Sequence, residues 1–569
     1  MNKRSMNSKA MIVGLDGATM ELIVPWVEQG KLPNLGRMMR EGVWAELRSS
    51  IPYITTTAWS SFATGTNPGR HGILDFYQHR PGSFEIYLAN SAVRRGKTMW
   101  KRVSEQGKRV CIINVPMTYP PEQVNGVLIS GMDAPGTASH FTHPEHLYEE
   151  LKQALGEYTI DVHFEEIVKG AVPRLDDYRA YLDLLCAMVE KRLRATEYLM
   201  EKYPWDLLVT VFVETDRIQH LFWKFMDPSH PHYKRGEAEH LGDAILKVYQ
   251  KCDAALGSLL DRAGENTDVL IMSDHGAGAG ERVFYVRPWL LANEYLILKA
   301  SSASGNGLKR FAAKSIRSLF AVAKAYVPKN LKQRLKKQII GRDKYISMRL
   351  YGGVNWERTR AYSEGVCGNI FINLKGREQH GIVEPGEEYK KLLKEIAEKL
   401  LQVKDPKTGK SVVTKVYRKE ELYHGPFLDH APDLTVEGFP EYHCRGDSFA
   451  KGASDEEEAL FGDAPMSGTH RLNGAFLALG PHFKRGMRLS DAAIVDILPT
   501  VLHVLGMEIP GSIDGRVLTD ALTEEYLRGN PVKTAEEEAE AGEQPLGDGY
   551  SDSEREQIEE RLKGLGYLE

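Results

Sequence analysis

Residues 10–17 read AMIVGLDG, a short apolar run that ends in an aspartate and a glycine. The same pattern returns at residues 207–216, LLVTVFVETD, and at residues 268–276, DVLIMSDHG. Near-continuous apolar runs of this length are typical of parallel strands that are covered on both faces. Because longer helical patterns separate the runs, the sequence predicts repeated strand–helix–strand units.

Three more apolar runs and four helical patterns extend this prediction along the chain. The runs predict strands at residues 110–115, 126–130 and 475–479, and the patterns predict helices at residues 22–26, 35–41, 176–202 and 244–263. The predicted fold class is therefore α/β, with a mostly parallel sheet sandwiched by helices. With 569 residues, the chain is long enough to bury a large core without disulfides.

Composition excludes several classes of protein. Lys and Arg number 73 and Asp and Glu 78, so a net charge of −5 gives no sign of a nucleic acid-binding module. The five cysteines are scattered and form no CxxC pair, which argues against a disulfide scaffold and a cysteine zinc site. They favour a reducing compartment, and we expect a cytoplasmic protein. We expect no secretory signal, because no apolar h-region precedes an A-x-A cleavage site after the first basic residues. We expect no transmembrane helix, because no run of about 18 apolar residues is present.

Changes of composition suggest how the chain is organised. We predict a core at residues 9–290 and 463–527, an inserted cap region at 291–462, and an acidic linker with a C-terminal helix at 528–569. Within the cap, residues 308–349 combine an apolar stripe with a basic face, and Asp343 is the one acid there against thirteen Lys or Arg. Such a segment is typical of a solvated helix face or of contact with an anionic membrane surface.

Aspartates follow three of the predicted strands, at Asp16, Asp216 and Asp274. Ligands of open α/β sheets bind outside the carboxyl ends of the strands. Any one of these aspartates alone is typical of a helix cap or a turn. Three carboxylates at one sheet edge repel one another unless a cation lies between them, so together they favour a metal site.

Histidines accompany two of these aspartates. Asp216 and His220 form a D-x-x-x-H pattern, which places both side chains on one side of a helical turn, and His275 directly follows Asp274. Imidazole with carboxylate suits zinc (Zn²⁺), with Mn²⁺ or Fe²⁺ as alternatives. A lone D-x-x-x-H also occurs as a hydrogen-bonded helix pair. We expect His71, in an RHG turn, to be a structural hydrogen-bonding residue and not a ligand.

A cluster of three threonines at residues 55–57 precedes a helical pattern that Gly65 and Pro68 end. A hydroxyl at a helix N-terminus lies at the positive end of the helix dipole, which favours an alkoxide and an incoming anion. Such a threonine alone is typical of an ordinary helix cap. Beside a metal it is a candidate nucleophile, because metal coordination activates a hydroxyl that is otherwise weakly nucleophilic.

The order of these motifs resembles the alkaline phosphatase superfamily, and within it the type I phosphodiesterase/nucleotide pyrophosphatase family. The order is a strand followed by Asp, T-x-x-A-W-x-S-x-x-T-G-x-x-P-x-x-H-G, D-x-x-x-H, S-D-H-G and a late G-x-H that contains His470. Further matches are DILPT at residues 496–500 and IDG at residues 513–515. The motifs span nearly the whole chain, and their combination is far more specific than any one of them.

The resemblance implies an alkaline phosphatase-like fold and a two-metal site, with Zn²⁺ as the favoured ion and Mn²⁺ as the alternative. The implied ligands are Asp216, His220 and His470 for one ion, and Asp16, Asp274, His275 and the nucleophile for the other. The family spacing to the T-G and H-G pairs selects Thr55 as the nucleophile. The implied reaction is hydrolysis of a phosphoester substrate, as a phosphodiesterase or phosphomonoesterase, through a phosphothreonine intermediate.

Two features depart from close relatives. Nucleotide pyrophosphatases carry an Asn shortly after the H-G turn, and residues 73–76 contain none, so the oxyanion contact must come from backbone N–H groups or elsewhere. The C/S-x-P-x-R motif of sulfatases is also absent. Two alternative functions remain open: a phosphomutase or phosphotransferase on the same fold, and a non-catalytic metal-binding scaffold.

Overall fold

The structure is a computed structural model that describes residues 8–79, 82–84, 86–168, 172–299, 351, 353–446, 460–536 and 549–564. The basic segment predicted at residues 308–349 and most of the acidic linker lie outside the described residues.

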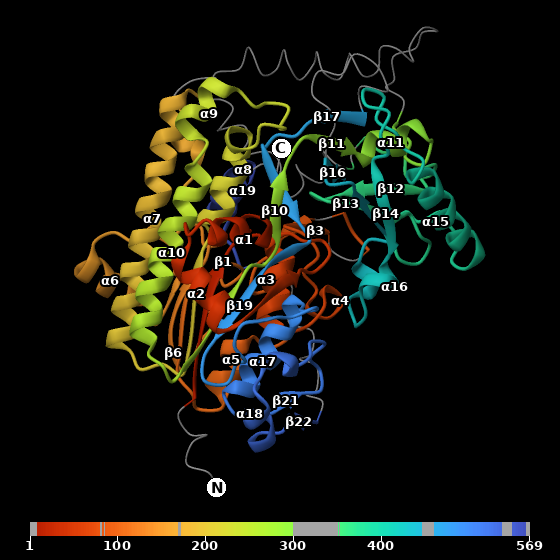
Figure 1. The fold of residues 1–569 in the computed structure, drawn as a ribbon. Helices are drawn as coiled ribbons and strands as arrows, with labels where there is room; N and C mark the ends of the chain where they lie inside the picture. The colour runs from red at the N-terminus through yellow and green to blue at the C-terminus, as the bar shows by residue number, and fades with distance from the viewer. Residues whose placement is uncertain are drawn as a thin grey trace, which may run out of the picture.

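Among the described residues, a nine-stranded sheet forms the centre of the molecule (Figure 1). Across the sheet the order is β20 (Met487–Arg488), β2 (Val43–Arg48), β19 (Asn473–Leu479), β9 (Thr267–Met272), β1 (Lys9–Leu15), β8 (Leu207–Phe212), β5 (Val110–Val115), β6 (Gly126–Ser130) and β7 (Thr142–His143). Strands β9, β1, β8, β5 and β6 run parallel, whereas β19 is antiparallel to both β9 and β2. The predicted α/β fold class is confirmed.

The central strands are buried along almost their whole length, as their continuous apolar sequences require. All six predicted strands belong to this sheet. Strand β2 was not predicted from the sequence, because VWAELR alternates buried and more exposed residues over only six positions. It covers the outer edge of β19 and so extends the sheet beyond its parallel part.

Helices cover both faces of the sheet. On one side α7 (Leu175–Lys202) and α10 (Ala244–Ala263) pack together and against the central strands, and they form the left of Figure 1. On the other side α3 (Thr55–Thr64), α5 (Met99–Glu105) and α17 (Ile497–Val504) contact one another, and α17 contacts β1. The remaining helices of the core are α1 (Met20–Glu28), α2 (Pro33–Glu41), α4 (Pro68–His71), α6 (Leu147–Leu155), α8 (Glu214–Met226), α9 (Arg235–Leu241) and α18 (Glu524–Gly529).

A smaller antiparallel sheet lies at the right of Figure 1, in the order β12 (Ala361–Glu364), β13 (Gly368–Ile372), β15 (Leu434–Gly438) and β14 (Val413–Arg418). Its neighbouring helices are α11 (Val286–Ala292), α15 (Glu387–Leu400) and α16 (Lys419–Leu422). Strand β11 (Arg282–Tyr285) pairs with β16 (Tyr442–Arg445) and with β17 (Phe461–Asp463). Three short pairs complete the strands: β3 (Tyr77–His79) with β4 (Ile86–Leu88), β10 (Gly276–Ala279) with β18 (Gly468–Arg471), and β21 (Ile509–Pro510) with β22 (Thr534–Ala535).

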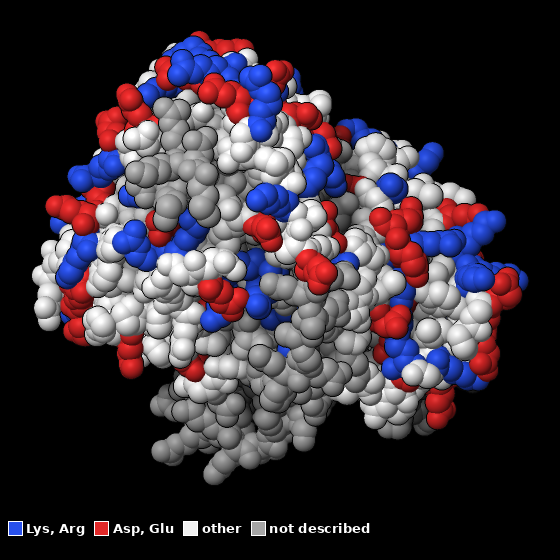
Figure 2. Space-filling model, turned by 90° about the horizontal axis from the view of Figure 1, so that it is seen from below, with Lys and Arg blue, Asp and Glu red and all other residues white. Residues whose placement is uncertain are grey.

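The predicted C-terminal helix is present as α19 (Asp552–Gly564), and it packs against the core through Ile558 and Leu562. No helix in the described part of the chain is long and apolar enough to cross a membrane. On the face shown in Figure 2, basic and acidic side chains are interspersed over the coloured part and neither sign dominates there.

Candidate active site

Three adjacent parallel strands bring the predicted aspartates to one edge of the sheet. Strand β1 lies between β9 and β8, and Asp16 follows its last residue. Asp216 lies in the first turn of α8, just after β8, and Asp274 follows β9. All three carboxylates are buried. The edge is the carboxyl end of the parallel strands, where ligands of such sheets bind.

His470 reaches this edge through a second strand pairing. In the antiparallel pair of β10 and β18, His470 lies opposite Ala277, two residues after His275. The imidazoles of His275 and His470 stack with their ring centroids 3.6 Å apart. A late segment of the chain thus completes a cluster that three early strands begin.

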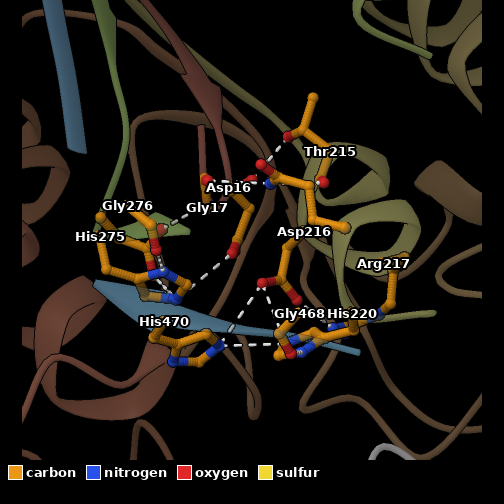
Figure 3. Close-up of polar contacts among 12 residues, drawn as sticks. Asp16, Gly17, Thr215, Asp216, Arg217, His220, His275, Gly276, Gly468 and His470 are labelled. Atoms are coloured by element: carbon orange, nitrogen blue, oxygen red, sulfur yellow. Dashed lines mark hydrogen bonds and ion pairs between the residues drawn. The ribbon is translucent and has the colours of Figure 1, made fainter. Parts of the chain in front are cut away.

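The first group of side chains consists of Asp216, His220 and His470 (Figure 3). Asp216 Oδ1 lies 3.2 Å from His220 Nε2 and 3.5 Å from His470 Nε2. The two Nε2 atoms lie 3.1 Å apart. One carboxylate oxygen and two ring nitrogens therefore converge on a single point, as ligands of one ion do.

The second group lies beside the first. His275 Nε2 is 3.2 Å from Asp274 Oδ2 and 3.8 Å from Asp16 Oδ1. Asp274 Oδ1 accepts from the backbone N–H of Gly17 at 3.2 Å, and Asp16 Oδ2 accepts from the indole N–H of Trp59 at 3.0 Å. One oxygen of each carboxylate is thereby held by the protein, and the other points into the cluster.

The three histidines are all oriented in the same way. Each donates its Nδ1–H to a backbone carbonyl: that of Gly468 for His220 (2.9 Å), Gly276 for His275 (3.0 Å) and Tyr53 for His470 (3.1 Å). Each Nδ1 therefore carries a proton, and each Nε2 faces the carboxylates, as in protein metal sites. Burial lowers the pKa of His220, but the facing Asp216 outweighs this effect and raises the pKa above its usual value. Burial lowers the pKa of His275 to about 4 and that of His470 to about 3, so both rings are neutral at pH 7.

The carboxylates of the cluster need positive charge between them. Burial, together with Asp274 and Asp216, holds the pKa of Asp16 well above its usual range. Burial opposes the ionisation of Asp216 as well, but the facing His220 and His470 lower its pKa well below its usual range. A cation at this point would favour the ionised form of every carboxylate in the cluster.

Several buried atoms of the cluster have no hydrogen-bond partner: Asp16 Oδ1, Asp274 Oδ2 and His275 Nε2. Buried polar atoms without partners are costly, and each unpartnered atom here is a metal-ligating type. Imidazole and carboxylate together are the donor set of zinc and related divalent cations. The residues present therefore fit divalent metal ions.

The threonine cluster opens α3, which begins at Thr55 and whose ten residues are all buried. Ile54 precedes the helix and no side chain caps it, so N–H groups of the first turn have no intrahelical acceptor. The hydroxyl of Thr55 is buried without a hydrogen-bond partner, as are those of Thr56 and Thr57. Trp59, one turn after Thr55 on the same helix face, donates to Asp16, which directs that face toward the cluster.

His71 lies outside the cluster, as predicted. Its Nε2 is 2.9 Å from the Ser61 hydroxyl, and its Nδ1 accepts from the backbone N–H of Ile73 at 3.1 Å. Both ring nitrogens are thus used in hydrogen bonds, and the bond to Ser61 joins α4 to α3.

The structure adds two residues that sequence reasoning missed. The Arg217 guanidinium donates to Asp216 Oδ2 and to Asp161 Oδ2, each at 2.9 Å, and all three side chains are buried. Burial opposes the charge on Asp161, but Arg217 lowers its pKa to about 2. Arg217 was visible in the D-x-x-x-H motif, whereas nothing near Asp161 in the sequence marked it as a partner.

The fold and the cluster together define a phosphoester hydrolase of the alkaline phosphatase superfamily, with a candidate metal site at the carboxyl ends of its parallel strands. The sequence profile of the family described as "Type I phosphodiesterase / nucleotide pyrophosphatase" matches residues 10–451. The chain belongs to this family and is an enzyme of its reaction class, acting on phosphoesters. No curated protein sequence matches the chain.

Solved structures with a similar fold include phosphonoacetate hydrolase from Sinorhizobium meliloti in complex with phosphonoformate. It shares 15% sequence identity with this chain, with a TM-score of 0.50, over 88% of this chain and 96% of the other. Human ectonucleotide pyrophosphatase/phosphodiesterase 5 matches over 91% of this chain and 100% of its own, with 13% identity and a TM-score of 0.48. At 15% identity, the likeness to the hydrolase concerns the fold alone.

Proposed function

We propose that the enzyme hydrolyses phosphoesters with Thr55 as its nucleophile, at a site that holds two divalent metal ions. The observation that carries the proposal is the shared orientation of three histidines, whose Nε2 atoms all face the buried carboxylates. The proposed ligands are those expected from the sequence: Asp216, His220 and His470 for one ion, and Asp16, Asp274, His275 and Thr55 for the other. The donor set favours Zn²⁺, with Mn²⁺ as the alternative.

The proposed reaction uses Thr55, which begins α3 one helical turn before Trp59, the donor to Asp16. When bound, the ions would supply the positive charge that favours the alkoxide of Thr55 and stabilises the leaving oxygen. Thr55 Oγ1 attacks phosphorus, forms a P–O bond and expels the alcohol, which leaves a phosphothreonine. Water then attacks the same phosphorus from the opposite side and regenerates the Thr55 hydroxyl. The N–H groups at the start of α3 suit a phosphoryl oxygen and can take the place of the missing Asn.

Asp75 does not take the place of that Asn. Its carboxylate accepts from the N–H of Val366 at 3.2 Å and from Asn369 at 3.4 Å, so it faces the hairpin of β12 and β13. We therefore propose backbone N–H groups at the start of α3, and not Asp75, as the donors to the phosphoryl group.

The state of the cysteines is informative about the cellular compartment of the enzyme. All five are free thiols in the structure. Free thiols persist where glutathione keeps cysteines reduced, which supports our proposal of a cytoplasmic enzyme.

The test uses wild-type enzyme loaded with Zn²⁺ or Mn²⁺ and three substrates: p-nitrophenyl phosphate, bis-p-nitrophenyl phosphate and p-nitrophenyl phenylphosphonate. We expect release of p-nitrophenol from at least one substrate, and mass spectrometry of the acid-quenched enzyme should find a phosphoryl group on the peptide that contains Thr55. Product analysis with added glycerol separates hydrolysis from phosphoryl transfer to an alcohol.

Thr55→Ala should abolish turnover but leave the fold and most of the bound metal in place, because it removes one hydroxyl and adds no bulk. Thr57→Ala is the matched control on the same helix and should remain active. An active Thr55→Ala beside an inactive Thr56→Ala or Thr57→Ala would show that a different threonine is the nucleophile.

A further inference from the structure

The backbone turn at Asp16 and Gly17 lies between the two groups of candidate metal ligands (Figure 3). The carboxylate of Asp16 belongs to the second group, and the N–H of Gly17 donates to Asp274 Oδ1 at 3.2 Å. A Cβ atom on Gly17 would lie 2.9 Å from Asp216 Oδ1, so the turn is also in close contact with the first group. The φ angle of Gly17 is +66°, which glycine adopts readily. The position of this turn therefore affects the spacing between the two groups.

Two side chains at the start of α8 hold the carbonyls of the turn. Thr215 Oγ1 donates to the carbonyl of Asp16 at 2.6 Å. Gln219 Nε2 donates to the carbonyl of Gly17 at 2.9 Å, and to that of Thr215 at 2.8 Å. Gln219 is buried and directly precedes His220 on the helix. The helix that supplies ligands of the first group therefore also holds the turn that belongs to the second.

The surroundings of Gln219 define one orientation of its amide. The Tyr249 hydroxyl accepts from the backbone N–H of Thr19 at 3.4 Å and donates its own proton to Gln219 Oε1 at 3.2 Å. Burial holds the pKa of Tyr249 well above its usual range, so the hydroxyl keeps this proton. The other end of the amide faces two carbonyl oxygens, which only accept, so it must be the NH₂ group. Both of its N–H groups are thus used within the protein.

We propose that Gln219 is a positioning residue for the second metal ion, and the inference rests on the two-metal site of the proposed function. Asp16 Oδ1 and Asp274 Oδ2 are buried without hydrogen-bond partners, and they are proposed ligands of that ion. Gln219 fixes the turn that carries the first of these carboxylates and that donates to the second. It acts on the ion through this turn, because its own polar atoms are already occupied.

Gln219→Met removes the three hydrogen bonds of the amide and keeps a side chain of similar size. The carbonyl of Gly17 is then buried without its donor, which favours movement of the turn. Loss of a residue that orients metal ligands typically lowers metal affinity by about 10–100-fold. We expect a loss of this size for the second ion alone, because the ligands of the first ion are on α8 and β18.

The test measures Zn²⁺ binding to the metal-free, full-length protein by calorimetry, with one ion isolated at a time. His470→Ala removes a ligand of the first ion, and in this background Gln219→Met should raise the Kd of the remaining ion by about 10–100-fold. Asp274→Ala removes a ligand of the second ion, and in this background Gln219→Met should leave the Kd nearly unchanged. A merely structural role of Gln219 would weaken both ions alike.

Tyr249→Phe is a milder variant, because it removes only the donor to Gln219 Oε1. It should raise the Kd of the second ion by less than Gln219→Met does, and it provides the same test if that variant does not fold. Gln250→Met is the matched control, since Gln250 is exposed on α10 and its amide lies 3.4 Å from the carbonyl of Lys31. It should change neither Kd.

An unchanged Kd of the second ion, or equal changes for both ions, would overturn the proposal. A single ion in wild type would overturn it together with the proposed two-metal site. Failure of the proposed reaction alone looks different: the second ion would depend on Gln219 as expected, while p-nitrophenyl phosphate and its diesters would remain uncleaved.

Discussion

The Nε2 atoms of His220 and His470 lie 3.1 Å apart, although 250 positions separate the two residues in the sequence. Both Nδ1 atoms donate to backbone carbonyls, so the two Nε2 atoms face each other in a buried site. Two ring nitrogens at this distance repel unless a proton or a cation lies between them. Asp216 faces the same point, which makes a divalent cation the better partner for the group.

The metal content should follow this geometry. Wild type saturated with Zn²⁺ should contain about two ions per chain, and His470→Ala should retain about one, because it removes a ligand of a single ion. Chelation should lower the melting temperature and added Zn²⁺ should restore it, since free Zn²⁺ at 100 times its Kd stabilises the folded state by about 2.7 kcal/mol per site. Mass spectrometry of the metal and thermal unfolding measure the two effects.

His482→Gln is the control for this experiment. His482 lies 2.5 Å from Asp268, so it forms a histidine–carboxylate pair outside the cluster. Its loss should leave the metal content unchanged. Two ions per chain in His470→Ala would contradict the ligand set.

Arg217 should be a large contributor to the stability of the site. Its guanidinium is buried between Asp216 and Asp161, and removal of one member of a buried pair destabilises a protein by about 3–5 kcal/mol. Arg217→Met keeps most of the side-chain volume but leaves two buried carboxylates without their cation. Urea unfolding of the metal-free variant should show this loss of unfolding free energy, and added Zn²⁺ should restore part of the stability.

The same change at an exposed position provides the comparison. Arg235 pairs with Glu239 on α9, and both side chains are largely exposed. Arg235→Met should change the free energy of unfolding by less than about 1 kcal/mol. Equal effects at both positions would mean that the buried pair contributes no more than a surface pair.

The parallel part of the sheet, and the position of most residues of the cluster at its edge, could be predicted from the sequence. Strand β1 and its neighbours are continuous apolar runs, and each aspartate lies within four residues of the end of such a strand, so the local pattern indicates the position of the cluster. The structure brings Asp16, Asp216 and Asp274 to one edge because β9, β1 and β8 are adjacent in the sheet.

Other features depended on contacts between distant segments. The stacking of His275 on His470 results from the pairing of β10 with β18, two short strands without a distinct sequence pattern. The bond between Arg217 and Asp161 joins a helix to a loop. The position of α19 against the segment after β6 likewise depends on hydrogen bonds from Arg561 to backbone carbonyls, which the side-chain pattern of Ile558 and Leu562 does not specify.

A pH-dependent contact joins the core to the smaller sheet. His79, at the end of β3, lies 2.7 Å from the carboxylate of Glu364 in β12. Burial lowers the pKa of His79, but Glu364 outweighs this effect, and the net pKa is raised above 6.5. A raised folded-state pKa contributes stability that is fully present below about pH 6.5 and is lost as the pH rises through the folded-state value.

Wild type should therefore lose stability relative to His79→Gln between pH 6 and pH 9. Each unit by which the pKa is raised corresponds to about 1.4 kcal/mol of this difference. Urea unfolding of both proteins at the two pH values measures it. A difference that stays constant with pH would show that folding does not raise the pKa of His79.

The C-terminal helix should stabilise the core without contributing metal ligands. Truncation after Glu536 keeps β22 and removes Tyr550, Ile558 and Leu562, which are each at most 9% exposed. Burial of each such side chain contributes about 1.5–3 kcal/mol, and the entropy lost on ordering the tail offsets part of the sum. The truncated protein should have a lower melting temperature and an unchanged metal content.

Arg561→Ala should lower the free energy of unfolding as well, by about 1.5–3 kcal/mol, because it removes a charged donor from three carbonyls. If the truncated protein instead keeps the melting temperature of wild type but loses an oligomer on size-exclusion chromatography, α19 is an element that binds another chain.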